Sequence, residues 1–192
     1  MATIKAGKVT FTEAASQGQF GYVKGTCKWA ELLQVGMYGT FGIKLYGDNV
    51  VELETELAAM QDSAFKEVEE VGKKAIKADL YKEEEDGTKF LAFKLKETKY
   101  DGTLNKISFF DAGGNAVPDW DKLVGNGSTV KVKYRVAPYY MASTKMVGLS
   151  FSFYAVQVID LKEFSGGGDS GFGDETDSHS SFDAAADNNE DF

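Results

Sequence analysis

Three stretches of the sequence place cations and aromatic rings at alternate positions, between apolar residues. Alternate side chains of a β-strand point to opposite faces, so each stretch has an apolar face and a second face that can contact a ligand. The second face carries Lys44 and Tyr46 in "FGIKLYG", Phe90, Lys94, Lys96 and Tyr100 in "KFLAFKLKETKY", and Lys131, Lys133 and Arg135 in "TVKVKYRV". Lysines neutralise phosphates and exposed rings stack on bases, so the pattern favours single-stranded nucleic acid as ligand. The alternative is an ordinary solvated sheet face, whose rings pack on their neighbours.

Catalytic chemistry finds little support in the residue types. The single histidine, His179, lies in a polar C-terminal segment, and the single cysteine, Cys27, has no partner for a Cys-His dyad. Carboxylates are numerous, which leaves a metal-dependent nuclease open on composition, but "DSGFGD" lacks the spacing of a calcium loop. The Gly-rich stretches lack the Lys-Ser/Thr of a phosphate loop. We expect no enzyme activity, no cofactor and no metal site.

The elements that must position these residues are mostly strands. Turn signals separate expected strands at about 4–12, 20–33, 37–46, 88–100, 104–111, 128–137 and 147–161. The expected inward residues are Phe41, Ile43, Leu45, Leu91, Phe93, Leu95, Val130, Val132, Tyr134 and Val136. Such short, closely spaced strands predict a mainly β fold, a small and partly open barrel with one inserted helix, and a sandwich is the main rival.

One segment has helical rather than strand periodicity. Apolar residues recur at three- and four-residue spacing between Val50 and Ala75, which predicts an amphipathic helix that covers one end of the sheet. Asn49 and Glu52 have the spacing of a capping box at its start. A short helical turn is also expected at "PDWDKLVG", beginning at Pro118.

The net charge of -9 is concentrated at the C-terminal end of the chain. Eight of the 30 acids lie in residues 165–192, which contain no Lys or Arg, so 22 acids face 21 bases in residues 1–164. The composition of this segment predicts a disordered acidic tail from about Ser165 and one folded domain before it. A solubilising role is the simplest interpretation of such a tail. Its isolated rings, Phe172, Phe182 and Phe192, favour a short linear motif instead.

The longer motifs resemble the single-stranded DNA-binding proteins of T-seven-like bacteriophages. The resemblance rests on "GNGSTVKVKYRVAPYY", then "VGLSFSFYAVQVIDLKEF" and "GGGD", and upstream on "GTFGIKLYG" and "DGTKFLAFKLK" in the same order. An acidic tail ending in Asp-Phe is a further point of agreement, and the likeness covers about residues 36–192. It implies an oligonucleotide/oligosaccharide-binding (OB) barrel, sequence-independent single-strand binding, and a homodimer in the cytoplasm of an infected bacterial host. The chain is then neither secreted nor membrane-bound.

The resemblance also assigns roles to individual residues. Lys94 and Lys96 fall on the basic and aromatic pair of the family's DNA-binding strand, Tyr139 matches the stacking aromatic after the proline, and Tyr140 assists it. Together with strand parity, this match predicts that one groove is lined by Lys94, Lys96, Lys131, Lys133, Arg135 and Tyr139. The tail is expected to compete for that groove and to dock replication proteins, a DNA polymerase or helicase/primase, through Asp187, Glu190, Asp191 and Phe192.

A second function of a different class fits the same sequence. In it, the acidic tail occupies a basic partner as a DNA mimic and the barrel is only a scaffold. Oligonucleotide binding that weakens with salt is expected for the first function, and no oligonucleotide binding for the second.

Overall fold

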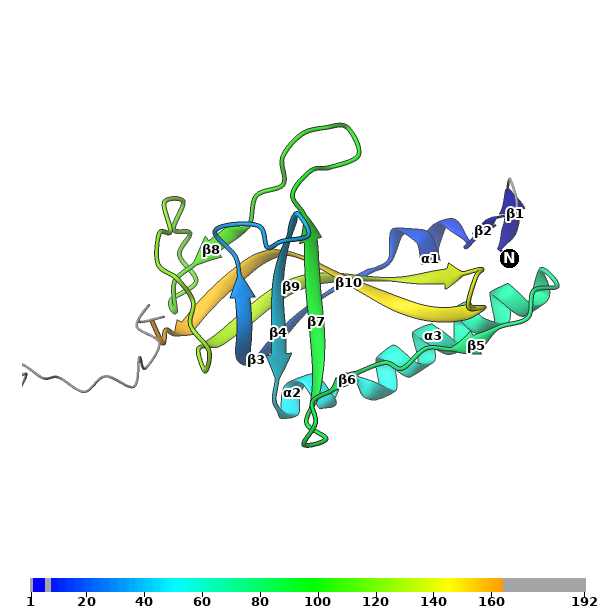
Figure 1. Ribbon diagram of the computed structural model, residues 1–192, viewed down its shortest axis with the longest axis horizontal. Helices are drawn as coiled ribbons and strands as arrows, with labels where there is room; N and C mark the ends of the chain where they lie inside the picture. The colour runs from blue at the N-terminus through cyan, green and yellow to red at the C-terminus, as the bar shows by residue number, and fades with distance from the viewer. Residues whose placement is uncertain (1, 6–7, 164–192) are drawn as a thin grey trace, which may run out of the picture.

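Long antiparallel strands form most of the computed structural model, which describes residues 2–5 and 8–163 (Figure 1). Its strands are β1 (Thr3–Lys5), β2 (Lys8–Thr10), β3 (Gln19–Glu31), β4 (Thr40–Tyr46), β5 (Ile76–Lys77), β6 (Lys82–Glu83), β7 (Lys89–Lys96), β8 (Ser108–Phe110), β9 (Thr129–Met141) and β10 (Met146–Asp160). Its helices are α1 (Glu13–Gln17), α2 (Asp48–Val51) and α3 (Glu54–Glu70).

The main sheet curls into a partly open barrel. Its strands follow the order β5-β10-β9-β3-β4-β7-β6, β8 pairs with β10, and β1 and β2 form a separate hairpin. β3 pairs with β9 along Gln19–Thr26 and with β4 from Thr26 to Glu31, so one strand joins the two sides of the barrel. β7 and β10 lie close together, but no ladder joins them in the part of the chain that the structure describes. The predicted mainly β, partly open barrel with an inserted helix is confirmed.

The barrel interior is filled by the residues that strand parity assigns to it. The expected inward residues of β7 and β9 are all buried, as are Ile43 and Leu45 of β4, and Phe41 packs partly buried against the same core. Phe93 lies at its centre, with its ring centroid 5.5 Å from that of Tyr134 and 5.7 Å from that of Phe151. The opposite parity of each strand therefore faces outward.

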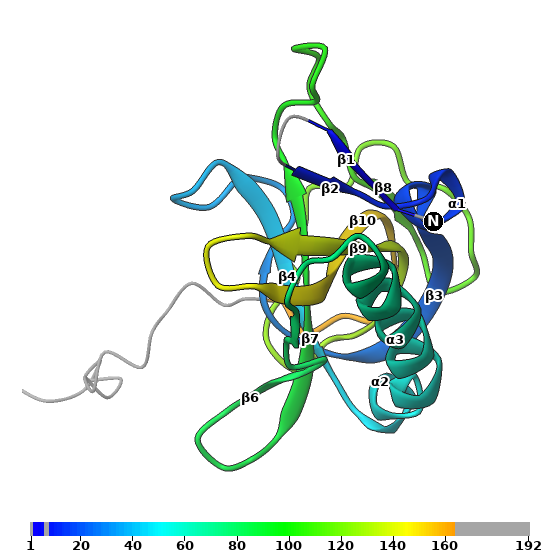
Figure 2. The same cartoon turned by 90° about the vertical axis from the view of Figure 1, so that its right-hand side faces the viewer.

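The helical segment divides into two helices. Residues 52 and 53 interrupt it between α2 and α3, and α3 ends at Glu70. The capping box is wrong, because α2 begins at Asp48, with Gly47 as its cap, which places Asn49 inside the helix. Val50 reaches the barrel core from α2, while α3 packs along β9 and β10 (Figure 2).

Two further segments differ from expectation. The expected strand at 4–12 is instead the β1–β2 hairpin followed by α1, whose cap is Thr12; the backbone N–H of Thr12 donates to Glu67 of α3. The segment after Pro118 is a turn without a helix. There the Trp120 ring stacks on Phe109 at 5.6 Å and its N–H donates to the Lys122 carbonyl, which holds the segment against the core.

Replacing Phe93 by Ala is expected to lower the free energy of unfolding by about 3–5 kcal/mol, because it leaves a cavity in the barrel core. Urea unfolding measures this loss. Phe20→Ala is the matched control: the Phe20 ring is 65% exposed, so the change should stay within about 0.5 kcal/mol. Equal losses for the two variants would contradict the separation of core and surface rings.

Candidate functional site

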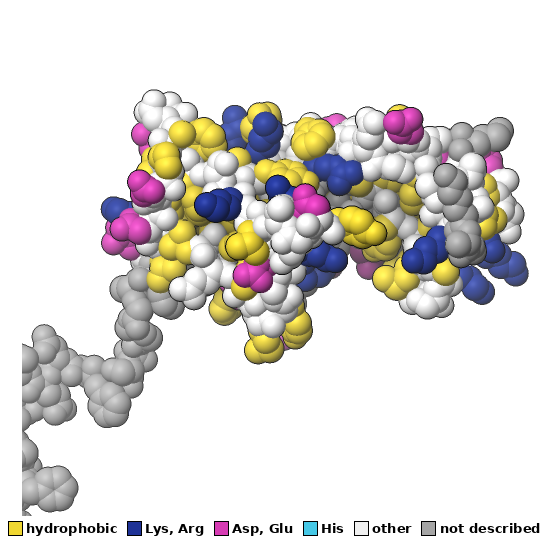
Figure 3. Space-filling view, turned by 90° about the horizontal axis from the view of Figure 1, so that it is seen from above, with side chains coloured by type: hydrophobic (Ala, Val, Ile, Leu, Met, Phe, Trp, Pro, Cys, Tyr) yellow, Lys and Arg dark blue, Asp and Glu magenta, His cyan; other side chains and the backbone are white. Residues whose placement is uncertain are grey.

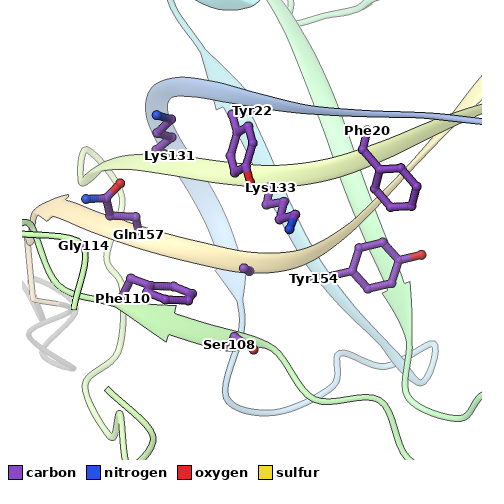
Figure 4. A pocket seen from close by; sticks show the side chains of 10 residues that line it. Phe20, Tyr22, Ser108, Phe110, Gly114, Lys131, Lys133, Tyr154 and Gln157 are labelled. Atoms are coloured by element: carbon purple, nitrogen blue, oxygen red, sulfur yellow. The ribbon is translucent and has the colours of Figure 1, made fainter. Parts of the chain in front are cut away.

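A groove of about 630 Å³ crosses the outer face of β3, β9 and β10 and extends to β8 (Figure 4). It is lined by Phe20, Tyr22, Ser108, Phe110, Gly114, Lys131, Lys133, Tyr154, Ala155 and Gln157. Four of these residues are aromatic, two are lysines, and none is an acid. The groove therefore combines ring faces with positive charge.

Strand register brings these residues together. Tyr22 pairs with Lys133, and Lys133 pairs in turn with Ala155 of β10. Ala155 is then the partner of Ser108 in β8. Side chains of directly paired residues share one face of a sheet, so four strands contribute to one surface.

A β-bulge adds the fourth ring. The register of β10 against β9 shifts between Phe153 and Ala155, which leaves Tyr154 as the extra residue. Phe153 points into the core, whereas both Tyr154 and Ala155 line the groove. In Figure 4 the Tyr154 ring lies next to the Phe20 ring, at the end of the groove away from Gln157.

The two lysines of the groove and two of its four rings are exposed, and Phe110 and Tyr154 are partly buried. Phe20 is 65% and Tyr22 60% exposed. The ammonium groups of Lys131 and Lys133 lie 5.4 and 5.7 Å from the centroid of the Tyr22 ring. Within the described residues, neither lysine forms an ion pair. An anionic ligand with planar groups would find both kinds of contact here.

Arg135 shares this face of β9, but its charge is already engaged. Its Nε donates to the carbonyl of Gln17 and its Nη2 to that of Ser16, both at 2.6 Å. These carbonyls belong to the last turn of α1, so Arg135 fixes α1 on the sheet.

Tyr139 and Tyr140 lie farther along β9, outside the lining of the groove. Tyr139 faces the same way as the lysines, and its ring covers Gly148, where an added Cβ would lie 2.6 Å from the ring. Tyr140 faces the other way; its hydroxyl donates to the Lys74 carbonyl and its ring packs in the cluster that contains Phe11. Tyr140 thus stabilises the packing of β9 against its neighbours.

Lys44, Lys94 and Lys96 lie on a different surface, the outer face of β4 and β7. Lys94 pairs with Gly42 and Lys96 with Thr40, and both lysines are exposed. Because β3 and β4 separate β7 from β9 in the curled sheet, the structure does not bring Lys94 and Lys96 into one groove with Lys131 and Lys133.

The expected exposure of Tyr46 and Phe90 is wrong. They are only 6% and 5% exposed, and their ring centroids lie 5.2 Å apart beneath the β6–β7 hairpin. Glu84 of that hairpin accepts hydrogen bonds from Tyr46 and from Lys44, and burial together with Glu84 raises the pKa of Tyr46. Tyr100, by contrast, is fully exposed in the connection between β7 and β8.

Four groove rings were missed by sequence reasoning. Phe20 and Tyr22 alternate with the buried Val23 and Cys27 in β3, so sorting this strand by parity would have found them. Tyr154 was hidden by the bulge, which breaks the alternation of β10. Phe110 belongs to a strand of three residues, too short for a periodic signal.

Other kinds of site are not evident in the described part of the chain. It contains no cluster of His, Cys, Asp or Glu suited to a metal ion. None of its helices has the length and apolar character that a membrane span needs. Cys27 is buried, and burial raises the pKa of its thiol to about 11. His179 and the tail residues Asp187, Glu190, Asp191 and Phe192 lie outside the described residues.

Cations and apolar side chains also mix over the wider surface. On the face seen in Figure 3, Lys and Arg side chains lie between hydrophobic ones along the barrel. Acidic side chains are also present on this face, whereas the lining of the groove has none.

No protein-family model and no curated protein sequence matches the chain. Among solved structures, it is similar to gp2.5, a single-stranded DNA-binding protein encoded by bacteriophage T7, with a TM-score of 0.65 and 20% identity over 79% of this chain and 92% of that one. The single-stranded DNA-binding protein from bacteriophage Enc34 gives a TM-score of 0.55 and 11% identity over 81% and 92%. The chain therefore shares the fold of these bacteriophage proteins.

Arg135→Ala is expected to lower the free energy of unfolding by about 1–3 kcal/mol, because two carbonyls of α1 lose a charged donor. Chemical denaturation measures the effect. Lys133→Ala, two residues away on the same face, removes a cation without such bonds and should leave stability within about 0.5 kcal/mol. An Arg135→Ala protein as stable as its parent would show that the two hydrogen bonds do not hold α1.

Proposed function

We propose that this chain, which shares its fold with bacteriophage single-stranded DNA-binding proteins, itself binds single-stranded DNA in the groove of β3, β8, β9 and β10. The observation that carries the proposal is the lining of the groove, which has four rings, two lysines and no carboxylate. Lys131 and Lys133 contact phosphates, and the rings stack on bases.

The groove favours unpaired DNA over a duplex. Bases in a duplex are stacked on one another, so their faces cannot reach Phe20, Tyr22 or Tyr154. A duplex keeps the phosphate contacts to lysine and loses the stacking contacts. Binding to single strands is therefore the tighter of the two.

The groove offers little to distinguish one base from another. The Gln157 side chain already donates to the Ala112 carbonyl at 3.1 Å, and Ser108 is short. Stacking accepts every base because every base has a π-face. The binding is consequently independent of sequence.

The predicted DNA-binding residues that lie outside the groove have a smaller part in this proposal. Tyr139 continues the groove face along β9, while Lys94, Lys96 and Tyr100 contact DNA that extends beyond the groove. Lys44 stays paired with Glu84 and has no direct part in binding. Tyr46 and Phe90 have no accessible ring face for a base.

The acidic tail has two roles in the proposal. A tether of about 28 residues spans roughly 25–30 Å, and it begins shortly after the β10 residues of the groove. Its eight acids compete with DNA for Lys131 and Lys133 at high effective concentration. Once DNA displaces the tail, Phe192 anchors the tail to a replication protein, which is a DNA polymerase or helicase/primase. Asp187, Glu190 and Asp191 attract this partner electrostatically as it approaches.

The cellular setting in the proposal is the one that the resemblance to bacteriophage single-stranded DNA-binding proteins implies. The chain acts as a homodimer in DNA replication, recombination and repair of a bacteriophage, in the cytoplasm of its bacterial host. It has no enzyme activity of its own. A DNA-mimic function gains no support, since a scaffold does not need an acid-free groove with two exposed rings, Phe20 and Tyr22.

Tyr22→Ala is expected to weaken binding of an oligo-dT by about 1–3 kcal/mol at every salt concentration, because the variant loses a stacking ring and no charge. Fluorescence anisotropy with a labelled oligonucleotide measures this loss. Tyr139→Ala, measured alongside it, reports whether DNA continues along β9.

Lys133→Ala is the control that separates charge from stacking. It should reduce the slope of log affinity against log salt by about one unit, whereas Tyr22→Ala leaves the slope unchanged. Unchanged affinity in a folded Tyr22→Ala protein would remove the groove from the proposal.

Deleting residues 165–192 is expected to tighten binding of oligo-dT at low salt, because the competing acids are gone. The deletion should also abolish capture of the partner polymerase in a pull-down. Phe192→Ala should keep the parent's DNA affinity and still weaken that capture. Self-competition is excluded if the truncated protein binds no more tightly than the full chain, and normal capture by Phe192→Ala excludes the anchor.

A further inference from the structure

Trp29 is held in an exposed position by a strained backbone. Its side chain is 64% exposed, and its φ of 54° lies in the left-handed region that residues with a Cβ rarely adopt. It lies where the pairing of β3 with β4 is irregular, between Lys28 and Glu31. Its backbone N–H donates to Oδ1 of Asn126 at 2.8 Å, so a distant loop stabilises this conformation. Strain that is kept at one exposed ring points to a function of that ring.

The second tryptophan shows the contrast. Trp120 stacks on Phe109 and its N–H donates to the Lys122 carbonyl. Trp29 pairs with no aromatic ring among the described residues, and its indole N–H has no acceptor there.

The hollow beside Trp29 has a volume of about 310 Å³ and lies on the outer face of β4 and β7. Lys44, Lys82 and Lys94 line it together with a single acid, Glu31. Lys94 is exposed and forms no ion pair within the described residues, whereas Lys44 lies 3.1 Å from Glu84. Lys94 is thus available to an anion next to an accessible ring.

The outward residues of β3 connect this hollow to the groove. After Tyr22, which lines the groove, the outward positions are Lys24, Thr26 and Lys28. Lys24 pairs with Lys131, and Lys28 pairs with Lys44. The outward positions of β3 between the groove and Trp29 thus carry two lysines and no acid. Nearby carboxylates belong to the β6–β7 hairpin, where hydrogen bonds and also Lys28 lower the pKa values of Glu84 and Asp86.

We propose that Trp29 is a second stacking platform for an unpaired base, reached by the same DNA strand after it leaves the groove along β3. Lys24 and Lys28 contact the connecting phosphates, and Lys94 contacts the phosphate beside the stacked base. This inference rests on the proposed single-strand binding and extends it to the other side of the barrel. Only a strand longer than the groove reaches Trp29.

The two tryptophans of the chain allow a direct test. In a Trp120→Phe background, Trp29 is the only tryptophan and its fluorescence reports its own contacts. Oligo-dT strands of about 4 and about 16 nucleotides, the range of site sizes for one OB domain, are titrated into the full-length protein. Both strands should bind, as anisotropy of a labelled strand shows, but only the longer one should quench Trp29.

Substitutions of Trp29 measure how much this residue contributes to DNA affinity. Trp29→Ala should weaken binding of the longer strand by roughly 5–150-fold, the equivalent of one stacked base, and leave binding of the shorter strand unchanged. Trp29→Phe should recover most of the loss. Tyr22→Ala, in the groove, should weaken binding of both strands.

The outcomes separate the two proposals. Saturation by the longer strand without a change in Trp29 fluorescence, or unaltered affinity in Trp29→Ala, overturns the role of Trp29 and leaves the groove intact. If the shorter strand quenches Trp29 fluorescence as strongly as the longer one, the proposal that DNA fills the groove before it reaches Trp29 is overturned. Failure of both strands to bind the parent protein overturns the proposed function, and the role of Trp29 with it.

Discussion

The whole arrangement depends on β3 pairing with β9 along its first half and with β4 along its second half. This double pairing bends the sheet into a barrel and places the outward residues of β3 on two surfaces. The bend is crowded on its inner side, where a Cβ on Gly25 would lie 2.6 Å from the Tyr46 carbonyl oxygen. At Gly21 a Cβ would lie 2.7 Å from the Tyr134 hydroxyl. Glycine at these two positions lets β3 lie close to the core while Phe20, Tyr22 and Lys24 face outward.

Charge is distributed unevenly over the barrel. Some cations are held in contacts within the protein, and others are available to a ligand. Arg135 fixes α1, and Lys44 is tied to Glu84 on the β6–β7 hairpin. Lys131 and Lys133 are left without a carboxylate partner in the described residues and lie beside exposed rings. A near-neutral body can thus present a cationic groove, which the total charge of -9 conceals.

The sequence predicts the barrel well because alternation is a local property of each strand. Parity alone identified the buried residues of β7 and β9 and the outward position of Lys131 and Lys133. Parity did not identify Tyr154, because the direction of this side chain depends on a bulge. It also did not identify the burial of Tyr46 and Phe90, because the hairpin that covers them lies about 40 residues along the chain from Tyr46. The separation of Lys94 from Lys131 likewise follows from strand order, which no single strand encodes. Long-range pairing therefore sets which predicted residues meet.

Ultraviolet cross-linking of oligo-dT to the protein, followed by mass spectrometry of the cross-linked peptides, tests the central claim most directly, because it locates bases against side chains. The account predicts cross-links in segments 19–24, 108–114 and 154–157, which carry the four rings of the groove. Cross-linked protein with no modified residue in any of these segments would contradict it.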